Sequence, residues 1–412
     1  MSKPRFIVVG GGLIGVTTLY ELVSRGYDAA LFEAEEDLAL GASFANGGML
    51  TPSMPDPWNG PGVARHLFAS LFDPRSSMKL HLSQVPSLFS WGLKFLAGSG
   101  RARHEAATLA NYRLCARSLD RTRALTKELG LEFDQSDRGT LKVFESEAAM
   151  AGPLALAQRL AQEELRFEKL DAAATVAREP LLAPIADRIA GALYFPDDGV
   201  GDARKFVLAL AEKARELGAA INLGARVNDL ILREGRICGI VQDGKEHLGE
   251  VVLCTGVWSP ELAAQLGQSI PVKPAKGYSL SVDARALGNR MPRVPVIDDA
   301  MHAAVVPLGD RLRFVGTAEF AGFNQEIDQV RIDNLISLFE RLYPDLEGSI
   351  DLSDAKPWTG LRPMSASGQP IIRQSAKEGL WLNCGHGHLG WTMACGSAEQ
   401  IVDLIYEKAY RP

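Results

Sequence analysis

The sequence predicts a mixed α/β protein (α+β taken as a whole), in which a domain on a parallel sheet is interleaved with a domain on a mostly antiparallel sheet plus helices. Three observations predict this class: a βαβ pattern near the N-terminus, a second α/β stretch in mid-chain, and a later segment of alternating residues. A chain of 412 residues exceeds one ordinary core, so two domains are expected.

The N-terminal segment predicts one βαβ unit. Residues 5–9 form a short apolar run that is typical of a buried strand, and residues 28–32 predict a second strand. Between them, residues 13–25 carry apolar side chains at helical spacing, and Gly26 is a suitable residue to end that helix.

The second α/β stretch runs from Gly201 to Gly256. Residues 203–217 predict a helix, and three strands are expected at 226–233, 236–242 and 250–254, with Glu-Gly and Asp-Gly turn signals between them. Part of the first domain is therefore expected to return late in the sequence.

The other segments predict the second domain. Residues 81–190 are rich in helix formers, residues 266–354 alternate as strands do (for example 278–282 and 312–316), and residues 391–406 predict a closing helix. The expected boundaries are 1–80, 191–265 and 355–412 for the first domain, and 81–190 with 266–354 for the second, which would hold the substrate.

Composition excludes several classes of protein. The 46% hydrophobic and 23% charged residues are typical of a globular chain, and a formal net charge of -6 argues against nucleic acid as a partner. Arg5 precedes a short apolar run, but glycines interrupt that run, so we expect no signal peptide. No apolar run is long enough to span a membrane, and 5 cysteines in a long chain suggest reduced thiols and a cytoplasmic protein.

A glycine motif carries the first functional prediction. Gly10, Gly12 and Gly15 have the G-x-G-x-x-G spacing, which permits a tight turn, a close approach of pyrophosphate and close packing of helix on strand. The motif follows a strand, opens a helix at Leu13, and is followed by Glu33, whose carboxylate suits ribose hydroxyls and disfavours NADP. A Rossmann-like dinucleotide site is therefore expected, although this motif cannot separate NAD from FAD.

A later strand bears on that choice. Val251 to Leu253 form an apolar run that continues into Cys254, Thr255 and Gly256. This segment is similar to the late strand that closes the FAD site in many flavoproteins, and an ordinary strand end is the alternative.

Three further motifs bring a resemblance into view. They are Gly41–Gly48, with the sequence Gly-Ala-Ser-Phe-Ala-Asn-Gly-Gly; Thr359–Met364, with Thr-Gly-Leu-Arg-Pro-Met; and Gly385–Gly396, which begins Gly-His-Gly-His-Leu-Gly-Trp-Thr. Together with Pro55–Trp58 and Lys276–Ser279, in that order along the chain, they resemble the D-amino-acid oxidase superfamily of flavoproteins. Within it the chain is most similar to the family of bacterial D-amino acid dehydrogenase small subunits, over nearly its whole length. Phe44 and Met49, where related members vary, leave the exact substrate open.

The resemblance implies an activity and a cofactor. It implies non-covalent FAD, a hydride passed from the α-carbon of a D-amino acid to flavin N5, and an imino acid that water hydrolyses to an oxo acid. It also implies a peripheral membrane enzyme at the cytoplasmic face of the inner membrane that passes electrons to quinone. Cys384 and Cys395 lie near the expected ring position, so a thioether link stays open, although a buried cysteine is more often a small hydrophobe.

Three side chains are candidates for the chemistry. Arg362 is expected to clamp the substrate carboxylate, because a planar guanidinium donates two parallel hydrogen bonds; a structural salt bridge is the alternative. Tyr278 is expected to add a hydroxyl or cap the pocket, with a core position as the alternative. His386 is a candidate base, and His302 a candidate pocket residue with a core or surface position favoured. His386 and His388 lack a suitably spaced third ligand, so no metal is expected.

The cofactor is expected to contact residues from six segments. The Gly385–Gly390 loop would place a helix N-terminus beneath the flavin ring, and the Ser43–Gly47 stretch (Ala45 included) would meet the pyrophosphate and ring edge. The expected contacts are Gly10, Gly12, Leu13, Ile14, Gly15, Glu33, Ser43, Asn46, Gly47, Gly48, Val227, Thr255, Gly256, Gly387, His388, Leu389, Gly390, Trp391 and Thr392.

Partners are less defined by the sequence. Apolar runs at 67–72 and 88–96, flanked by Arg65, Lys79, Arg101 and Arg103, suit a membrane surface or a quinone entrance, and a buried helix is the alternative. Oxygen as electron acceptor is the rival to quinone, and a homo-oligomer is also considered.

The rival functions are a secondary-amine enzyme acting on sarcosine, glycine or hydroxyproline, a flavin-bearing scaffold subunit, and an NAD dehydrogenase.

Overall fold

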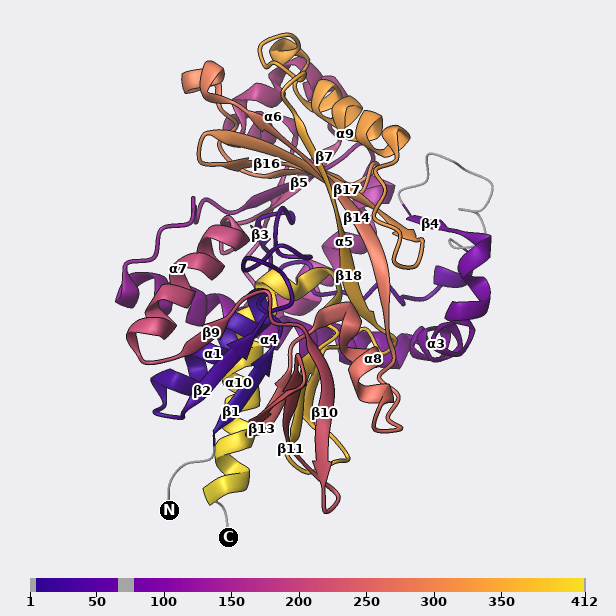
Figure 1. Ribbon diagram of the computed structural model, residues 1–412. Helices are drawn as coiled ribbons and strands as arrows, with labels where there is room; N and C mark the ends of the chain where they lie inside the picture. Colours follow the sequence, from indigo (N-terminus) through magenta and orange to yellow (C-terminus); the bar gives the residue numbers. More distant parts are fainter. Residues whose placement is uncertain (1–4, 66–77, 411–412) are drawn as a thin grey trace.

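The computed structural model describes residues 5–65 and 78–410. Its first sheet has six strands in the order β19-β20-β13-β1-β2-β9, and only the β19–β20 pair is antiparallel (Figure 1). The strands are β1 (Phe6–Val9), β2 (Ala29–Phe32), β9 (Ala220–Asn222), β13 (Glu250–Leu253), β19 (Ile371–Gln374) and β20 (Leu380–Cys384).

Helices cover one face of this sheet. Val8 and Leu31 point into a core that also holds Leu19, Phe206 and Ile401 from three of the helices. The apolar run of each buried strand therefore finds a matching helical face. The helices are α1 (Leu13–Ser24), α4 (Arg101–Leu129), α7 (Ala203–Glu216) and α10 (Gly390–Tyr410).

A small antiparallel sheet covers the other face. Ile7 and Phe32, which alternate with the residues above, pack against Leu230, Ile237 and Ile240. The small sheet consists of β10 (Val227–Arg233), β11 (Arg236–Gln242) and β12 (Lys245–Leu248).

The second large sheet has nine strands. Eight follow the order β18-β14-β17-β16-β15-β5-β7-β6, and β4 pairs with β17. Pairing is antiparallel except at β15–β5 and β17–β4. The strands are β4 (Met78–Leu80), β5 (Thr140–Phe144), β6 (Glu168–Leu170), β7 (Gly191–Phe195), β14 (Val272–Asp283), β15 (Val296–Asp298), β16 (Ala303–Leu308), β17 (Arg311–Phe320) and β18 (Lys356–Ser365).

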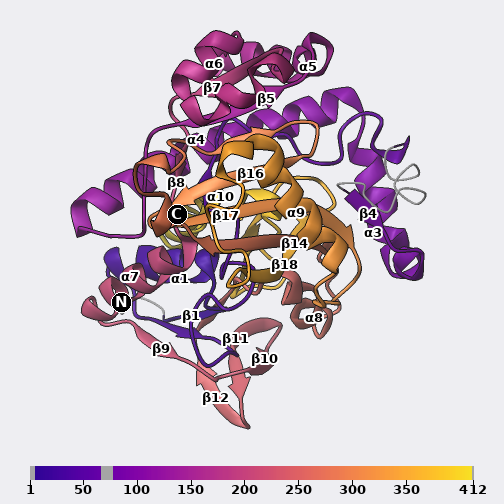
Figure 2. The same ribbon diagram turned by 90° about the horizontal axis from the view of Figure 1, so that it is seen from above.

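The outer helices pack against this second sheet. Leu335 and Phe339 of α9 (Gln329–Leu342) join Leu280 and Phe314 in its core. Seen from above, α5 (Glu147–Leu160) and α6 (Ala172–Arg178) lie at one end of the molecule and β10–β12 at the other (Figure 2). The remaining elements are β3 (Met49–Leu50), α3 (Val85–Gly98), β8 (Gly199–Val200) and α8 (Ser259–Ala264). Across residues 5–65 and 78–410, none of the helices has both the length and the apolar character of a membrane span.

The predicted fold class is confirmed, and so are the opening βαβ unit, the helix at 203–217 and the closing helix. Two local expectations are wrong. Residues 329–342, expected to alternate as strands, form α9, because their apolar side chains recur every three or four residues. The strand β12 was missed, because Lys-Glu-His-Leu has a single apolar residue and shows no strand pattern. These residues form a strand through their hydrogen bonds with β11.

The domain boundaries stay a prediction. Four elements cross the expected division. β4, β7 and β18, expected in the first domain, are hydrogen-bonded within the nine-stranded sheet. In the other direction, Leu119 and Leu125 of α4, expected in the second domain, lie in the core of the six-stranded sheet.

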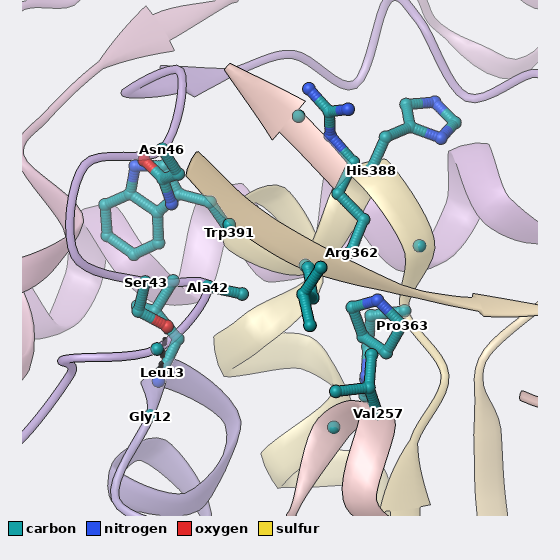
Figure 3. Close-up of a pocket in the computed structure, with 18 of the residues that line it drawn as sticks. Gly12, Leu13, Ala42, Ser43, Asn46, Val257, Arg362, Pro363, His388 and Trp391 are labelled. Carbon is teal, nitrogen blue, oxygen red and sulfur yellow. Dashed lines mark hydrogen bonds between the residues drawn. The ribbon is translucent and has the colours of Figure 1, made fainter. Parts of the chain in front are cut away.

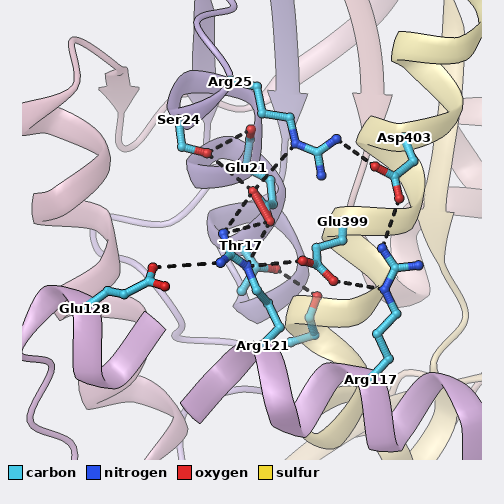
Figure 4. Close-up of polar contacts among 10 residues, drawn as sticks. Thr17, Glu21, Ser24, Arg25, Arg117, Arg121, Glu128, Glu399 and Asp403 are labelled. Atoms are coloured by element: carbon cyan, nitrogen blue, oxygen red, sulfur yellow. Dashed lines mark hydrogen bonds and ion pairs between the residues drawn. The ribbon is translucent and has the colours of Figure 1, made fainter. Parts of the chain in front are cut away.

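A polar network also ties α4 to α1 and α10, two of the helices that cover the first sheet (Figure 4). The Glu21 carboxylate on α1 accepts a hydrogen bond from Arg121 Nε at 3.1 Å. Arg121 reaches Glu399 of α10 at 3.3 Å, and Arg117 pairs with Asp403 at 2.9 Å. Glu21 is almost fully buried, and its ion pair with Arg121 offsets the cost of burying the carboxylate.

A buried carboxylate predicts a pH-dependent stability. Asp198 is 1% exposed and accepts hydrogen bonds from Ser53 Oγ and Thr140 Oγ1, both at 2.6 Å. Burial raises the pKa of Asp198 to about 7, so between pH 4 and 7 the folded state binds more protons than the unfolded state. The free energy of unfolding should therefore fall as pH rises through this window.

Between pH 5 and pH 8 we expect the free energy of unfolding of the wild-type protein to fall by about 2 kcal/mol more than that of Asp198→Asn, because the amide of the variant does not titrate. Urea unfolding of both proteins at the two pH values measures this difference. Parallel pH profiles for the two proteins would contradict it.

Candidate active site

A large cavity lies against both sheets. Its volume is about 1480 Å³, and it is lined by the β1–α1 turn, the 39–49 loop, the end of β13, strands β14, β17 and β18, and the start of α10. Figure 3 shows Leu13 and Ser43 on one side of this cavity and Arg362 with His388 on the other. The predicted site residues, which are scattered over the sequence, line this one space, with Gly15 as the exception.

Glycines shape the end of the cavity near α1. Gly10 has φ +107°, and a Cβ there would lie 2.7 Å from the Cys254 carbonyl oxygen. A Cβ on Gly15 would lie 1.8 Å from the Gly10 carbonyl oxygen, so Gly15 serves the packing of helix on strand. Leu13 N donates to Ser43 Oγ at 3.2 Å. The N-terminus of α1 faces the cavity, since Gly12, Leu13 and Ile14 line it.

Glu33 is held by backbone amides. Its carboxylate accepts hydrogen bonds from Gly11 N and, at 2.9 Å, from Glu35 N. These bonds fix the carboxylate at the end of β2 on the cavity wall, where its free lone pairs can accept hydroxyl protons.

The 43–48 loop is anchored to the second sheet by residues that sequence reasoning missed. Ser279 Oγ donates to the Ala45 carbonyl at 2.7 Å, and Arg313 Nη1 donates to the Asn46 carbonyl at 2.9 Å. The Asn46 side chain accepts from Gly48 N at 2.9 Å. No local pattern indicates these anchors, because more than two hundred residues separate them from the loop.

The start of α10 forms another wall. Residues 387–389 make a short 3-10 turn that leads into the helix at Gly390. Thr392 Oγ1 accepts from Thr51 N at 3.1 Å, and Trp391 Nε1 donates to the Gly201 carbonyl at 3.0 Å. His388 stacks on Trp58 with the ring centroids 5.2 Å apart. The turn is thereby fixed against the rest of the site.

Arg362 has the environment of a carboxylate clamp. Its Nη1 donates to the Thr317 carbonyl at 3.1 Å, and its guanidinium lies 5.5 Å from the Trp58 ring. Among the described residues no carboxylate pairs with it, and its separation from bulk water lowers the pKa to about 10. An enclosed cation on a cavity wall, with no carboxylate partner among the described residues, has the chemistry to bind an anionic ligand.

Gly277 makes room for that guanidinium. A Cβ at this position would lie 2.3 Å from Arg362 Cζ. We expect Gly277→Ala to displace the guanidinium and lower kcat/KM by about thirtyfold, roughly 2 kcal/mol of lost charge-assisted hydrogen bonding, with FAD retained. Steady-state kinetics with a dye acceptor measure this, with Gly92→Ala as a control, since a Cβ there meets nothing within 4 Å. Unchanged kinetics for Gly277→Ala would contradict the role.

The other candidates for the chemistry have less suitable surroundings. Tyr278 lines the cavity, but its hydroxyl donates to Glu319 at 3.1 Å within a core, which favours the core alternative. His386 is 4% exposed, and burial lowers its pKa to about 3, so the ring is neutral and a weak proton acceptor. Burial likewise lowers the pKa of His388 to about 4. His302 lines the cavity with φ +47°.

The cysteines give little support to a covalent flavin link. Cys384 and Cys395 are each 1% exposed and lie outside the described lining of the cavity. Burial raises the pKa of Cys384 to about 11 and that of Cys395 to about 12, so neither is a reactive thiolate.

The fold and the glycine-lined cavity are those of a dinucleotide-binding oxidoreductase, and Arg362 lies in the same cavity. The sequence model described as FAD-dependent oxidoreductase (DAO) matches residues 5–404, and the chain belongs to this family. The chain is thus an FAD-dependent enzyme, and the NAD dehydrogenase alternative is wrong. The cavity fits FAD, because Gly10 and Gly12 leave backbone bare beside the N-terminus of α1 and Glu33 lies where ribose hydroxyls are expected.

Two curated relatives are similar over almost the whole chain. The D-amino acid dehydrogenase of Rhizorhabdus wittichii is 35% identical over 402 residues, covering 97% of this chain and 96% of the relative. That of Bradyrhizobium diazoefficiens is 34% identical over 405 residues, covering 98% and 95%.

Solved structures of lower identity share the fold. Glycine oxidase from Bacillus cereus superposes with a TM-score of 0.75 at 21% identity, covering 98% of this chain and 96% of that one. L-proline dehydrogenase from P. horikoshii gives a TM-score of 0.78 at 18% identity, covering 99% and 94%. At these identities the likeness shows the fold alone.

Proposed function

We propose that the chain catalyses the FAD-dependent oxidation of D-amino acids to imino acids, which water hydrolyses to 2-oxo acids. The observation that carries this is Arg362, an enclosed guanidinium on the cavity wall with no carboxylate partner among the described residues. The D-configuration rests on the relatives, which are D-amino acid dehydrogenases at 34–35% identity.

FAD, when bound, supplies the hydride acceptor that no amino acid side chain provides. The protein's own part is to bind and orient the substrate. Arg362, fixed by the Thr317 carbonyl and supported by the Trp58 ring, would hold the substrate carboxylate in a single orientation. His386 and His388 stay neutral at pH 7, so they add no charge that competes with Arg362 for the carboxylate.

The cofactor contacts predicted from the sequence form part of this proposal. The N-terminus of α1 would face the pyrophosphate, Glu33 the ribose, and the 387–392 turn the flavin ring. Cavity residues Val227, Thr255 and Gly256 would close the dinucleotide site from the side of β13.

We further propose that electrons leave to a quinone or a protein carrier. The names of the relatives support a dehydrogenase over an oxidase. All five cysteines are free thiols, which fits the proposed reducing cytoplasmic location. A homo-oligomer stays part of the proposal.

An anaerobic absorbance spectrum tests the function. We expect D-alanine or D-proline to bleach the flavin of the purified protein, and the L-forms to leave it oxidised. Bleaching only by sarcosine, glycine or hydroxyproline would replace the proposal with a secondary-amine enzyme. A flavin that no amine bleaches would support the scaffold alternative, and rapid reoxidation by air would contradict the dehydrogenase assignment.

A further inference from the structure

The cavity has a charged patch on the nine-stranded sheet that the proposed function does not use. Lys142 Nζ and Asp299 Oδ1 are 2.7 Å apart, and both residues line the cavity. Their side chains are only 19% and 18% exposed. Within the described residues no other charged group pairs with either side chain. The ammonium therefore keeps N–H donors, and the carboxylate keeps acceptors, that can meet a ligand.

Strand register connects this patch with the rest of the cavity wall. Residues paired across neighbouring strands point to the same face of a sheet. Four such residues, on β17, β16, β15 and β5 in that order, line the cavity: Val315, Ala304, Ile297 and Lys142. An apolar floor of three side chains therefore ends at the ion pair. The floor lies wholly within the described residues, whereas the apolar run expected at 67–72 lies outside them.

The patch lies about one amino acid side chain away from Arg362. The Arg362 guanidinium reaches β17, where it donates to the Thr317 carbonyl at 3.1 Å. Asp299 directly follows β15, two strands further along the sheet. Because adjacent strands are about 4.8 Å apart, about 10 Å separate the guanidinium from the patch. A hydrogen bond of about 3 Å at each end leaves about 4 Å, which matches an asparagine or glutamine side chain better than an alanine.

We infer that Lys142 and Asp299 form a side-chain subsite that selects D-amino acids with a neutral carboxamide side chain. This inference rests on the proposed function, which places the substrate carboxylate on Arg362. A carboxamide has a donor and an acceptor, so its N–H donates to Asp299 while its oxygen accepts from Lys142. Its methylene groups meet the apolar floor. A charged side chain fits less well, because it attracts one member of the ion pair and repels the other.

A purely structural tether is the alternative role for this ion pair. The strands β5 and β15 already pair through their backbones, from Leu141 to Val143 on one and from Val296 to Asp298 on the other. A single, partly exposed ion pair adds little to such a contact. A tether has no influence on the choice between substrates, so substrate preference distinguishes the two roles.

Four D-amino acids whose side chains end the same number of bonds from the α-carbon test the subsite. They are D-glutamine, D-norleucine, D-glutamate and D-ornithine, compared by kcat/KM with a dye acceptor on the FAD-loaded full chain. We expect the wild-type protein to prefer D-glutamine to each of the others by about tenfold or more. The reason is that each of the others leaves at least one member of the enclosed ion pair without a hydrogen bond.

Removing one charge of the pair should change the choice between the two charged substrates. Lys142→Met leaves the Asp299 carboxylate without its cation and should raise the ratio of kcat/KM for D-ornithine to that for D-glutamate by about tenfold or more. Asp299→Asn leaves the ammonium without its anion and should lower the same ratio by a similar factor. The matched control is Lys205→Met, which breaks a 2.8 Å pair with Asp134 outside the described lining of the cavity and should keep the wild-type ratio.

Flavin content shows whether each variant is folded, and the comparison of substrates on the wild-type protein needs no variant. A wild-type enzyme that uses D-norleucine as well as D-glutamine would overturn the inference. So would a D-ornithine to D-glutamate ratio that neither charge change moves, or that Lys205→Met moves equally. In these cases bleaching of the flavin by D-amino acids would leave the proposed function standing. Bleaching by no D-amino acid would refute the proposed function and the inference with it.

Discussion

Replacing Arg362 by methionine should lower kcat/KM for a D-amino acid by about a thousandfold or more, while FAD stays bound. Two charge-assisted hydrogen bonds are lost, and the substrate carboxylate is left enclosed without a counter-ion, which together cost about 4 kcal/mol or more. Methionine keeps the volume of the side chain and needs no hydrogen-bond partner, so within residues 5–65 and 78–410 the Thr317 carbonyl is the one group that loses a donor. Steady-state kinetics with a dye acceptor, together with the flavin spectrum, measure both effects.

A substrate without a carboxylate separates binding from a general loss of activity. The wild-type enzyme should strongly prefer D-alanine over D-alaninol, and Arg362→Met should lose most of this preference, because the two changes remove the same interaction. Arg362→Lys should recover part of the activity, since an ammonium keeps the charge but not the paired donors. An Arg362→Met enzyme that still prefers D-alanine as strongly as wild type would place the carboxylate elsewhere.

Local motifs made much of the candidate site predictable. Gly10 permits a tight turn, Gly12 lets a ligand approach the backbone, and Gly15 lets the helix pack closely on the strand. All three roles depend on neighbours within the same βαβ unit. Arg362 was identified by its motif, and the structure supplies what the motif could not, namely that no described carboxylate neutralises it.

Contacts between distant segments could not be predicted. Ser279 and Arg313 anchor the 43–48 loop by donating to its backbone carbonyl groups. Every residue carries such a carbonyl, so the sequence does not indicate which ones are bound. The contact of Tyr278 also could not be predicted from the sequence. Its position on a strand was predictable, but the buried Glu319 that accepts its hydroxyl lies on a neighbouring strand. The direction of the hydroxyl therefore depends on strand register, which the alternation of residues does not fix.

The interleaving of the two sheets was predictable only in outline. A late return of strands to the first sheet follows from the second α/β stretch, and β13 and β20 confirm it. The exact division did not follow, because β7 has the apolar character of a buried strand and could pair in either sheet, while β18 carries few apolar residues and does not indicate a sheet. Which sheet takes such a strand is decided by tertiary packing rather than by its own composition.

Gly15→Ala should remove FAD from the purified protein. A Cβ at this position would lie 1.8 Å from the Gly10 carbonyl oxygen, so α1 must move away from β1 and its N-terminus must leave the phosphate position. We expect less than about one-tenth of the wild-type flavin content and a loss of about 3 kcal/mol in the free energy of unfolding, the upper range for overpacking a tight contact. Absorbance of the purified protein and urea unfolding measure the two effects.

The control for this prediction is another helical glycine. Gly92 lies within α3, and a Cβ there meets nothing within 4 Å. Gly92→Ala should therefore keep its flavin and gain up to about 1 kcal/mol in the free energy of unfolding, because alanine has the higher helix propensity. A Gly15→Ala protein that binds FAD as wild type does would mean that the helix can shift without disturbing the phosphate site, and the cofactor would then have to be held mainly by the 43–48 loop and the start of α10.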